Sequence, residues 1–247
     1  MKPLMEVKRI RRYFGGIRAL DSVSLSIPAG KLTALIGPNG AGKTTLFNVI
    51  AGLMEADSGE ILLEGKSIAH LATEERARLG IARTFQSVRL FKNLTVEDHF
   101  ALALSQGDDD WGGMIENEKQ QQEYRKQGKE IMQILGLEKQ LTDKAADLSY
   151  GQRKLMDLGM ALVRDPKLLM LDEPVAGVNP GLRKKIQNIL KKLKKYKRTI
   201  LLVEHDMEFV MDVADRVIVM DAGKIIAEGN PSQIRSNPKV LEAYLGE

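Results

Sequence analysis

The apolar positions of the chain fall into short runs bounded by turn residues, and these runs predict strands. In the first segment Val23, Leu25 and Ile27 alternate with serines, which is typical of a half-buried strand. Three later runs are continuous and of the buried parallel type: residues 168–171, 199–203 and 217–220. A helical spacing over residues 181–195 lies between two of them. This order of elements favours an α/β fold with a parallel sheet and crossover helices.

The middle of the chain has a different pattern. Strand signals disappear over residues 90–148, and residues 106–113 are polar and contain several glycines. Residues 116–137 are charged but keep an apolar helical face. We therefore expect a helical subdomain inserted into the α/β core.

Composition narrows the class of protein. The chain has 247 residues, of which 43% are hydrophobic and 28% charged, so it is globular rather than largely disordered. It has no cysteine, which excludes disulfides, thiolate zinc sites and cysteine nucleophiles. No apolar run approaches the roughly 20 residues of a membrane span, and no signal peptide is visible. The net charge of +4 is compatible with phosphate ligands or with a membrane surface, but it is diagnostic of neither.

One glycine-rich segment carries a specific chemical signal. Residues 37–45 match the pattern G-x-x-x-x-G-K-[ST] in full, between an apolar run at residues 32–36 and a predicted helix at residues 44–53. Glycines let successive backbone N–H groups turn toward phosphate oxygens, and the helix N-terminus adds partial positive charge. The segment consists of Gly37, Pro38, Asn39, Gly40, Ala41, Gly42, Lys43, Thr44 and Thr45. We expect Lys43 to reach the β- and γ-phosphates of a nucleotide and the Thr44 hydroxyl to bind Mg²⁺.

A second candidate site follows the run at residues 168–171. Asp172 and Glu173 stand at the end of that predicted strand. In P-loop proteins an aspartate at this place helps to hold Mg²⁺, and an adjacent glutamate can orient or deprotonate water. An isolated acidic pair would indicate only a polar strand end, but together with the phosphate loop it predicts nucleotide hydrolysis.

Further segments resemble the motifs of ABC ATPases. Residues 148–152 (LSYGQ) resemble the signature motif, which is usually LSGGQ. Gln86 resembles the Q-loop glutamine, residues 176–179 occupy the place of the D-loop, and His205 resembles the switch histidine. The resemblance runs in family order from about Leu4 to the C-terminus, which makes it very specific.

Finer similarity points to one subgroup. The stretches RTFQSVRLFKNLTV and EPVAGVNP, the LSYGQ motif and the ending AEGNPSQIRSNPKVLEAYLGE look like those of the ATPase subunits of branched-chain amino acid importers. Two positions depart from the broad family pattern, since Tyr150 replaces a signature glycine and Asn179 replaces the usual D-loop aspartate. Both look like subgroup habits, and Asn179 leaves open the strength of the D-loop contact across a dimer.

The resemblance implies roles around a bound ATP. Phe14 would stack on adenine, with Tyr13 as the alternative. Residues 37–45 would hold the phosphates and Mg²⁺. Gln86 would contact Mg²⁺ or the attacking water and would report to a membrane partner.

The remaining motifs would perform hydrolysis. Asp172 would bind Mg²⁺, Glu173 would act as the general base, and His205 would contact the γ-phosphate. The signature residues would cap the γ-phosphate of an ATP held by a second copy: Ser149, Gly151 and Gln152. A helix start at the signature would supply free N–H groups for that anion, so two ATP molecules would lie between two subunits.

The resemblance also implies the domain organisation. Residues 1–247 would form a single ABC ATPase domain, an α/β P-loop NTPase core with a mostly parallel sheet, an N-terminal antiparallel β subdomain and an inserted α-helical subdomain. The core would comprise residues 1–88 and 153–228. Residues 89–152 would form the helical subdomain with the signature, and residues 229–247 a C-terminal extension.

Several partners are implied. They are a second ATPase subunit (the same chain or a paralogue), two integral membrane permease subunits, and a solute-binding protein that acts through the permeases. The chain would lie peripherally at the cytoplasmic face of the inner membrane. Val88, Leu90 and Phe91 are the apolar residues that we expect to contact a permease helix. No nucleic acid is expected, because the basic residues 183–198 lie on an amphipathic helix with a solvated face; contact with anionic lipid stays open.

The sequence thus predicts the ATP-hydrolysing subunit of a bacterial or archaeal importer for branched-chain or related amino acids. The alternatives are the ATPase subunit of a urea or amide importer, a soluble ABC ATPase of DNA repair or translation, and a nucleotide-binding regulator without turnover. The single cassette with a short, glycine-broken insertion argues against the soluble class, and Glu173 with His205 argues against the regulator. His70 and His99 lie outside these motifs, and we interpret them as surface or helix residues without a role.

Overall fold

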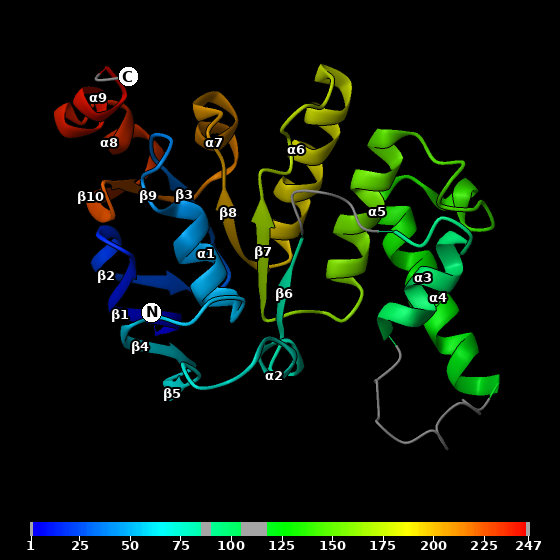
Figure 1. The fold of residues 1–247 in the computed structure, drawn as a ribbon. Coiled ribbons are helices and arrows are strands. Elements are labelled where there is room, and N and C mark those ends of the chain that lie inside the picture. Colours follow the sequence, from blue (N-terminus) through cyan, green and yellow to red (C-terminus); the bar gives the residue numbers. More distant parts are fainter. Residues whose placement is uncertain (1, 85–89, 105–117, 246–247) are drawn as a thin grey trace.

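A six-stranded sheet lies at the centre of the part of the chain that the structure, a computed structural model, describes: residues 2–84, 90–104 and 118–245. Its strands, in spatial order, are β10 (Lys224–Gly229), β9 (Arg216–Asp221), β3 (Leu32–Ile36), β8 (Thr199–Val203), β7 (Leu168–Asp172) and β6 (Ile81–Arg83). Neighbouring strands from β9 to β6 are parallel, and β10 pairs antiparallel with β9 (Figure 1). The predicted α/β class with a mostly parallel sheet is confirmed.

Alternate residues of β3, β7, β8 and β9 face two different hydrophobic clusters. In β8, Ile200 and Leu202 belong to one cluster, and Leu201 and Val203 belong to the other. Most of the helical residues in the first cluster come from α5 (Tyr150–Leu162), α6 (Pro180–Lys195) and α7 (Met207–Val213). The second includes residues of α1 (Lys43–Ala51) and of a second sheet. Because both faces are covered, the central strands β3, β7 and β8 are apolar apart from Thr33, Asp172 and Thr199.

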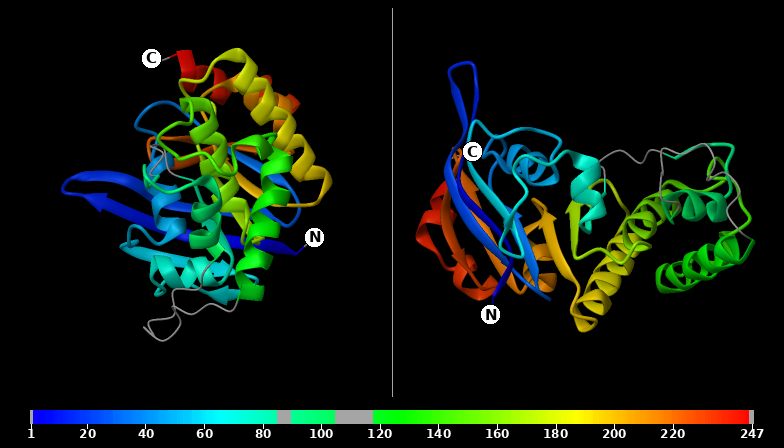
Figure 2. Two further views of the ribbon diagram at one scale, coloured as in Figure 1. Left: turned by 90° about the vertical axis from the view of Figure 1, so that its right-hand side faces the viewer. Right: turned by 90° about the horizontal axis from the view of Figure 1, so that it is seen from below.

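The second sheet is antiparallel and lies near the N-terminus. Its spatial order is β2 (Ile17–Pro28), β1 (Pro3–Phe14), β4 (Ser58–Leu63) and β5 (Lys66–Ser67). The hairpin of β1 and β2 extends beyond the rest of the molecule in the right-hand view of Figure 2. The expected antiparallel N-terminal β subdomain is confirmed.

Helices α3 (Val96–Leu104), α4 (Glu118–Leu135) and α5 pack together on the side of the core sheet away from the second sheet (Figure 1). Gly159 permits their close approach, because a Cβ there would lie 2.7 Å from a Leu135 methyl carbon. The shorter helical elements are α2 (Thr73–Arg78), η2 (Glu138–Gln140), α8 (Pro231–Arg235) and α9 (Pro238–Leu245). In the described ranges, no helix is long and apolar enough to cross a membrane.

Of the surface or helix position expected for His99, the helix position is confirmed. His99 lies on α3 but is fully buried. Its Nε2 accepts a hydrogen bond from the Phe91 N–H at 3.0 Å, and its Nδ1 lies 2.7 Å from the Thr95 carbonyl oxygen. A single imidazole therefore fixes the turn that presents Phe91. His70, in contrast, is exposed as expected.

Arg76 holds the end of helix α1 in place. Its buried guanidinium donates hydrogen bonds to the carbonyls of Val49 (2.7 Å) and Ile50 (2.9 Å) in the last turn of α1. It also binds the carbonyls of Leu71 and Ala69, both at 3.0 Å. Burial lowers the pKa of Arg76. The cation complements the negative end of the helix dipole and satisfies carbonyls that lack partners within the helix.

We expect Arg76→Met to lower the free energy of unfolding by about 2–4 kcal/mol, because four carbonyls lose the guanidinium as a donor and, of the two buried ones, only that of Val49 keeps another, the Gly52 N–H. Arg78→Met on the same helix is the control, because Arg78 is exposed and surface substitutions usually cost no more than about 0.5 kcal/mol. Urea denaturation of both variants checks this. Equal losses would contradict a specific role for Arg76.

Candidate functional site

The glycine-rich loop curls around the side chain of Lys43 at the carboxyl end of β3. The Lys43 Nζ donates hydrogen bonds to the carbonyl oxygens of Gly37 at 2.6 Å and of Pro38 at 2.7 Å. The Lys43 side chain is buried although it is charged. Helix α1 starts at once, with the Leu46 N–H bound to the Gly42 carbonyl. The loop thus places an ammonium group and a helix N-terminus together, as an anion site requires.

Two glycines of the loop are required by close backbone contacts. Gly37 has φ 149°, and a Cβ there would lie 2.0 Å from the carbonyl oxygen of Met220. Gly42 has φ 98°, and its Cβ would lie 2.5 Å from the carbonyl oxygen of Ala19. Any side chain at either place would displace β9 or β2, so the loop and the two sheets have to fit together.

Asp172 ends β7 beside Arg83, a residue that the sequence did not indicate. The Arg83 Nη2 donates to Asp172 Oδ2 at 2.9 Å, and the two side chains are only 12% and 7% exposed. Arg83 also donates to Asn48 Oδ1 at 2.6 Å and lies over the Phe47 ring, both on α1. Burial raises the pKa of Asp172, while the Arg83 guanidinium opposes that rise. Arg83 therefore ties the phosphate helix to the acidic strand end.

Glu173 and His205 face each other across the same edge of the sheet. The Glu173 Oε1 lies 3.5 Å from the His205 Nδ1. Glu173 has φ 46°, a left-handed conformation that is strained for a residue with a side chain. Its N–H donates to the Val203 carbonyl at 2.9 Å, which holds the turn against β8. The predicted base and the predicted switch histidine are thus neighbours.

The two candidate aromatic residues lie at the end of the β1–β2 hairpin. Tyr13 is 38% exposed and Phe14 is 41% exposed. The Tyr13 N–H donates to Asp57 Oδ2 at 2.6 Å, and the Arg12 guanidinium binds Asp57 Oδ1 at 2.9 Å. Arg12 also lies over the Phe14 ring, 5.1 Å from its centroid. Asp57, which sequence reasoning missed, thus fixes the backbone of this hairpin end, and both aromatic residues stay candidates.

The signature residues begin helix α5. Ser149 is its N-cap: the Gln152 N–H donates to Ser149 Oγ at 3.3 Å, and the Ser149 N–H donates to Gln152 Oε1 at 2.8 Å. They line a cavity of about 880 Å³ together with Gly151, Asn179 and the start of α6. Among the described residues, none of those at 37–45 lines this cavity. The structure therefore does not bring the signature and the phosphate loop together within one chain.

The candidate contact residues for a membrane partner differ in exposure. Gln86 and Val88 lie outside the described residues. Leu90 is half-buried and packs against the core, whereas Phe91 is 61% exposed. A cavity of about 1100 Å³ opens between α2, β6 and helices α3 to α5, and neither Leu90 nor Phe91 lines it.

The donor groups at this edge suit Mg²⁺. Thr44 supplies a hydroxyl at the start of α1, and Asp172 supplies a carboxylate at the end of β7. Mg²⁺ prefers oxygen ligands and usually takes only one or two carboxylates, with phosphates and waters completing its shell. In the described part of the chain, no group of three or more His, Cys, Asp or Glu residues could hold a metal ion.

This fold, with a phosphate loop, an acidic strand end and a signature helix, defines an ATP-binding cassette ATPase. The sequence matches the family model described as ABC transporter over residues 20–176, and a model described as branched-chain amino acid ATP-binding cassette transporter over residues 224–247. The chain belongs to the ABC transporter family, in the group of ATP-binding subunits related to branched-chain amino acid transport.

Relatives match over their whole length. The chain is 37% identical to the high-affinity branched-chain amino acid transport ATP-binding protein LivG of Escherichia coli K12, covering 100% of this chain and 99% of that protein. It is 38% identical to the probable LivG protein of Methanocaldococcus jannaschii, covering 100% of both. The crystal structure of the ADP conformation of MJ1267, an ATP-binding cassette of an ABC transporter, matches with a TM-score of 0.87 and 36% identity over 100% of both chains.

We expect Arg83→Met to lower the free energy of unfolding by about 3 kcal/mol at neutral pH, since it leaves the Asp172 carboxylate buried without its cation. The double variant Arg83→Met/Asp172→Asn should recover much of this loss, because no charge is then buried. Lys167→Met is the control: it breaks the exposed Lys167–Glu64 pair and should cost less than about 1 kcal/mol. Denaturant titration compares the three, and a double variant no more stable than Arg83→Met would refute the charge argument.

Proposed function

We propose that this chain hydrolyses ATP to drive the import of branched-chain or related amino acids through separate permease subunits. The observation that carries the proposal is the convergence of the Lys43 loop, Asp172, Glu173 and His205 at one edge of the core sheet. The type of solute rests on the names of full-length relatives and on the family model that matches the C-terminal residues.

Lys43 and Thr44 bind the phosphates. The Lys43 ammonium exchanges its two carbonyl partners for the more negative β- and γ-phosphate oxygens, because hydrogen bonds between ionised groups are about twice as strong as neutral ones. Thr44 and Asp172 would hold Mg²⁺, and the bound ion would supply positive charge against the β- and γ-phosphates. Phe14 or Tyr13 stacks on the adenine.

Glu173 and His205 act on the attacking water. Glu173 accepts the proton of the water, and His205 contacts the γ-phosphate and the Glu173 carboxylate. Gln86 adds a contact to Mg²⁺ or to the water. The strained backbone of Glu173, held by the Val203 carbonyl, fixes the direction of its carboxylate.

A complete site needs a second subunit. The signature cavity is lined by none of residues 37–45 among those described, so Ser149, Gly151 and Gln152 reach the γ-phosphate of an ATP held by a second copy or a paralogue. The N-terminal dipole of α5 suits that phosphate. Residues 89–152 form the helical subdomain that carries this signature, beside the core at residues 1–88 and 153–228 and the extension at 229–247.

The membrane partners contact the same helical subdomain. Phe91 is an exposed aromatic residue whose turn is fixed by His99. It suits insertion between the side chains of an amphipathic permease helix. The chain is accordingly peripheral, at the cytoplasmic face of the inner membrane, with two permeases and a solute-binding protein completing the transporter.

We expect Glu173→Gln to bind ATP normally and to lose turnover by about 10²–10⁴-fold, because an amide keeps the size but cannot accept a proton from water. Lys43→Ala should instead weaken nucleotide binding, since it removes the cation that faces the phosphates. ATPase assays and gel filtration in ATP and Mg²⁺ compare them. Retention of near wild-type turnover by Glu173→Gln would rule out Glu173 as the base.

We expect Phe91→Glu to abolish transport while leaving basal ATPase activity largely intact, because a charge replaces an apolar contact to the permease. Leu241→Glu is the control, since Leu241 is also an exposed apolar residue but lies on α9. Uptake of labelled leucine into vesicles with the assembled transporter is measured, with urea as a competitor. Transport at the wild-type rate by Phe91→Glu would refute the contact, and competition by urea but not by isoleucine would refute the solute class.

A further inference from the structure

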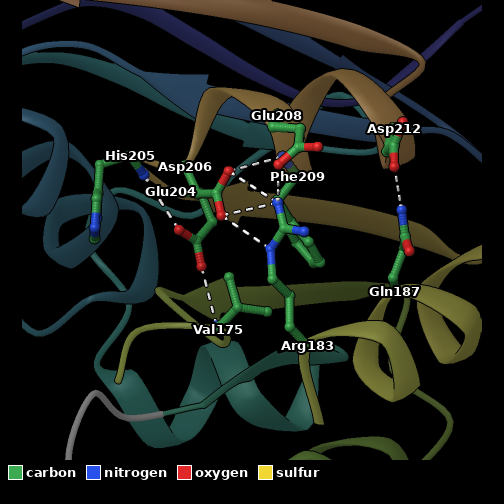
Figure 3. Close-up of polar contacts among 9 residues, drawn as sticks. All are labelled: Val175, Arg183, Gln187, Glu204, His205, Asp206, Glu208, Phe209 and Asp212. Atoms are coloured by element: carbon green, nitrogen blue, oxygen red, sulfur yellow. Dashed lines mark hydrogen bonds and ion pairs between the residues drawn. The ribbon is translucent and has the colours of Figure 1, made fainter. Parts of the chain in front are cut away.

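His205 stands between two acidic residues, and each of them binds the chain segment that follows Glu173 (Figure 3). On one side, Glu204 is fully buried. Its Oε1 accepts a hydrogen bond from the Val175 N–H at 3.1 Å, and its Oε2 accepts one from the His205 N–H at 3.2 Å. One carboxylate thus joins the backbone of His205 to a residue two positions after Glu173.

On the other side, Asp206 binds Arg183 through two hydrogen bonds. The Arg183 Nε donates to Asp206 Oδ2 at 3.0 Å, and the Arg183 Nη2 donates to Oδ1 at 3.1 Å. Asp206 Oδ1 also accepts the Phe209 N–H and so caps α7. Arg183 is held in turn by Glu208 and by the face of the Phe209 ring. A planar guanidinium with two bonds fixes orientation as well as distance.

Both anchors of His205 belong to one short stretch of chain. Val175 and Arg183 flank residues 176–179, and Asn179 caps the start of α6 between them through its bond to the Leu182 N–H at 2.9 Å. The Glu173 N–H is bound to the Val203 carbonyl. Strand β8 alone does not determine the position of the His205 backbone. The segment that follows Glu173 also holds it, through the bonds of Val175 and Arg183.

A buried carboxylate at position 204 is costly, and its partners explain its presence. Burial raises the pKa of Glu204, while hydrogen bonds from the Val175, His205 and Asp206 N–H groups favour its ionised form. An apolar residue here would avoid the burial of charge but would leave buried N–H groups without acceptors. The carboxylate therefore serves the geometry of the loop rather than the packing of the core.

We propose that Glu204 and Arg183 are positioning residues for ATP hydrolysis, which hold His205 at the distance from Glu173 that turnover requires; this rests on the proposed roles of Glu173 and His205. The 3.5 Å between the His205 Nδ1 and the Glu173 Oε1 is longer than an ordinary hydrogen bond. A small displacement of the His205 backbone is then enough to separate the two groups.

The test uses Glu204→Gln and Arg183→Gln in the full-length chain. The Val175 N–H and the His205 N–H bind different oxygens of Glu204, and in Glu204→Gln an NH2 group replaces one of these oxygens, so one of the two N–H groups loses its acceptor. Each variant should lower kcat about 10–100-fold, the usual effect of a displacement near 1 Å, with KM for ATP changed less than about twofold. Gln187→Leu is the matched control, because it removes the Gln187–Asp212 bond between the same two helices, away from His205 (Figure 3). Its kcat should equal that of the wild type.

A second measurement separates positioning from loss of fold. In a His205→Ala background, Glu204→Gln should have almost no further effect on kcat, because a residue that acts through His205 has nothing left to position. The inference would be overturned if the effects of Glu204→Gln and His205→Ala on kcat multiplied in the double variant, or if Gln187→Leu lost as much kcat as the test variants. Wild-type kcat in both Glu204→Gln and Arg183→Gln would overturn it as well. Absence of ATPase activity in the wild-type chain would instead refute the proposed function itself. Thermal melting of every variant confirms that folded proteins are compared.

Discussion

The register of three parallel strands is the constraint on which the site depends. Val203 of β8 pairs with Leu35 of β3 on one side and with Asp172 of β7 on the other. The phosphate loop, the Glu173 turn and the His205 loop all leave the sheet next to these paired residues, so they meet at one edge, where open α/β sheets bind their ligands. A slip of one residue in β7 would reverse its side chains and turn Asp172 away from that edge. The apolar cores on both faces make such a slip very unfavourable.

Several charged side chains lie at this edge of the sheet, where little water reaches them, and each of them binds a partner. Arg83 pairs with Asp172, Lys43 binds two loop carbonyls, and the Glu204 carboxylate accepts backbone N–H groups. In a medium of low polarity, satisfied networks of this kind are rigid, whereas a missing partner is costly. The strained Glu173 backbone persists because the surrounding hydrogen bonds determine its conformation.

Sequence patterns predicted the parts of the fold that repeat with a regular period. The buried strands and the α6 helix follow directly from apolar spacing, and the phosphate loop follows from a fixed pattern of glycines and lysine. Apolar spacing did not predict strand β1, because its pairing with β2 contains register shifts that break the alternation of buried and exposed residues. The contacts of Arg83, Glu204 and His99 were not predicted for another reason: each side chain binds groups that are distant or irregularly spaced in sequence, and a spacing rule cannot identify those partners. Their only sequence signal is proximity, because Arg83 precedes Gln86 by three residues and Glu204 precedes His205.

The side chains proposed for chemistry and those proposed for binding other molecules differ in their exposure to solvent. The charged groups proposed for chemistry are fixed near the sheet edge, with Lys43 and Asp172 buried. The groups proposed to meet other molecules are exposed aromatic residues: Phe14 or Tyr13 on a hairpin for the nucleotide base, and Phe91 on a turn for a permease. Each of these exposed aromatics stands on a short segment that one buried or ion-paired side chain holds, Asp57 for the hairpin and His99 for the turn. Binding surfaces that are fixed before the partner arrives lose little conformational entropy on contact.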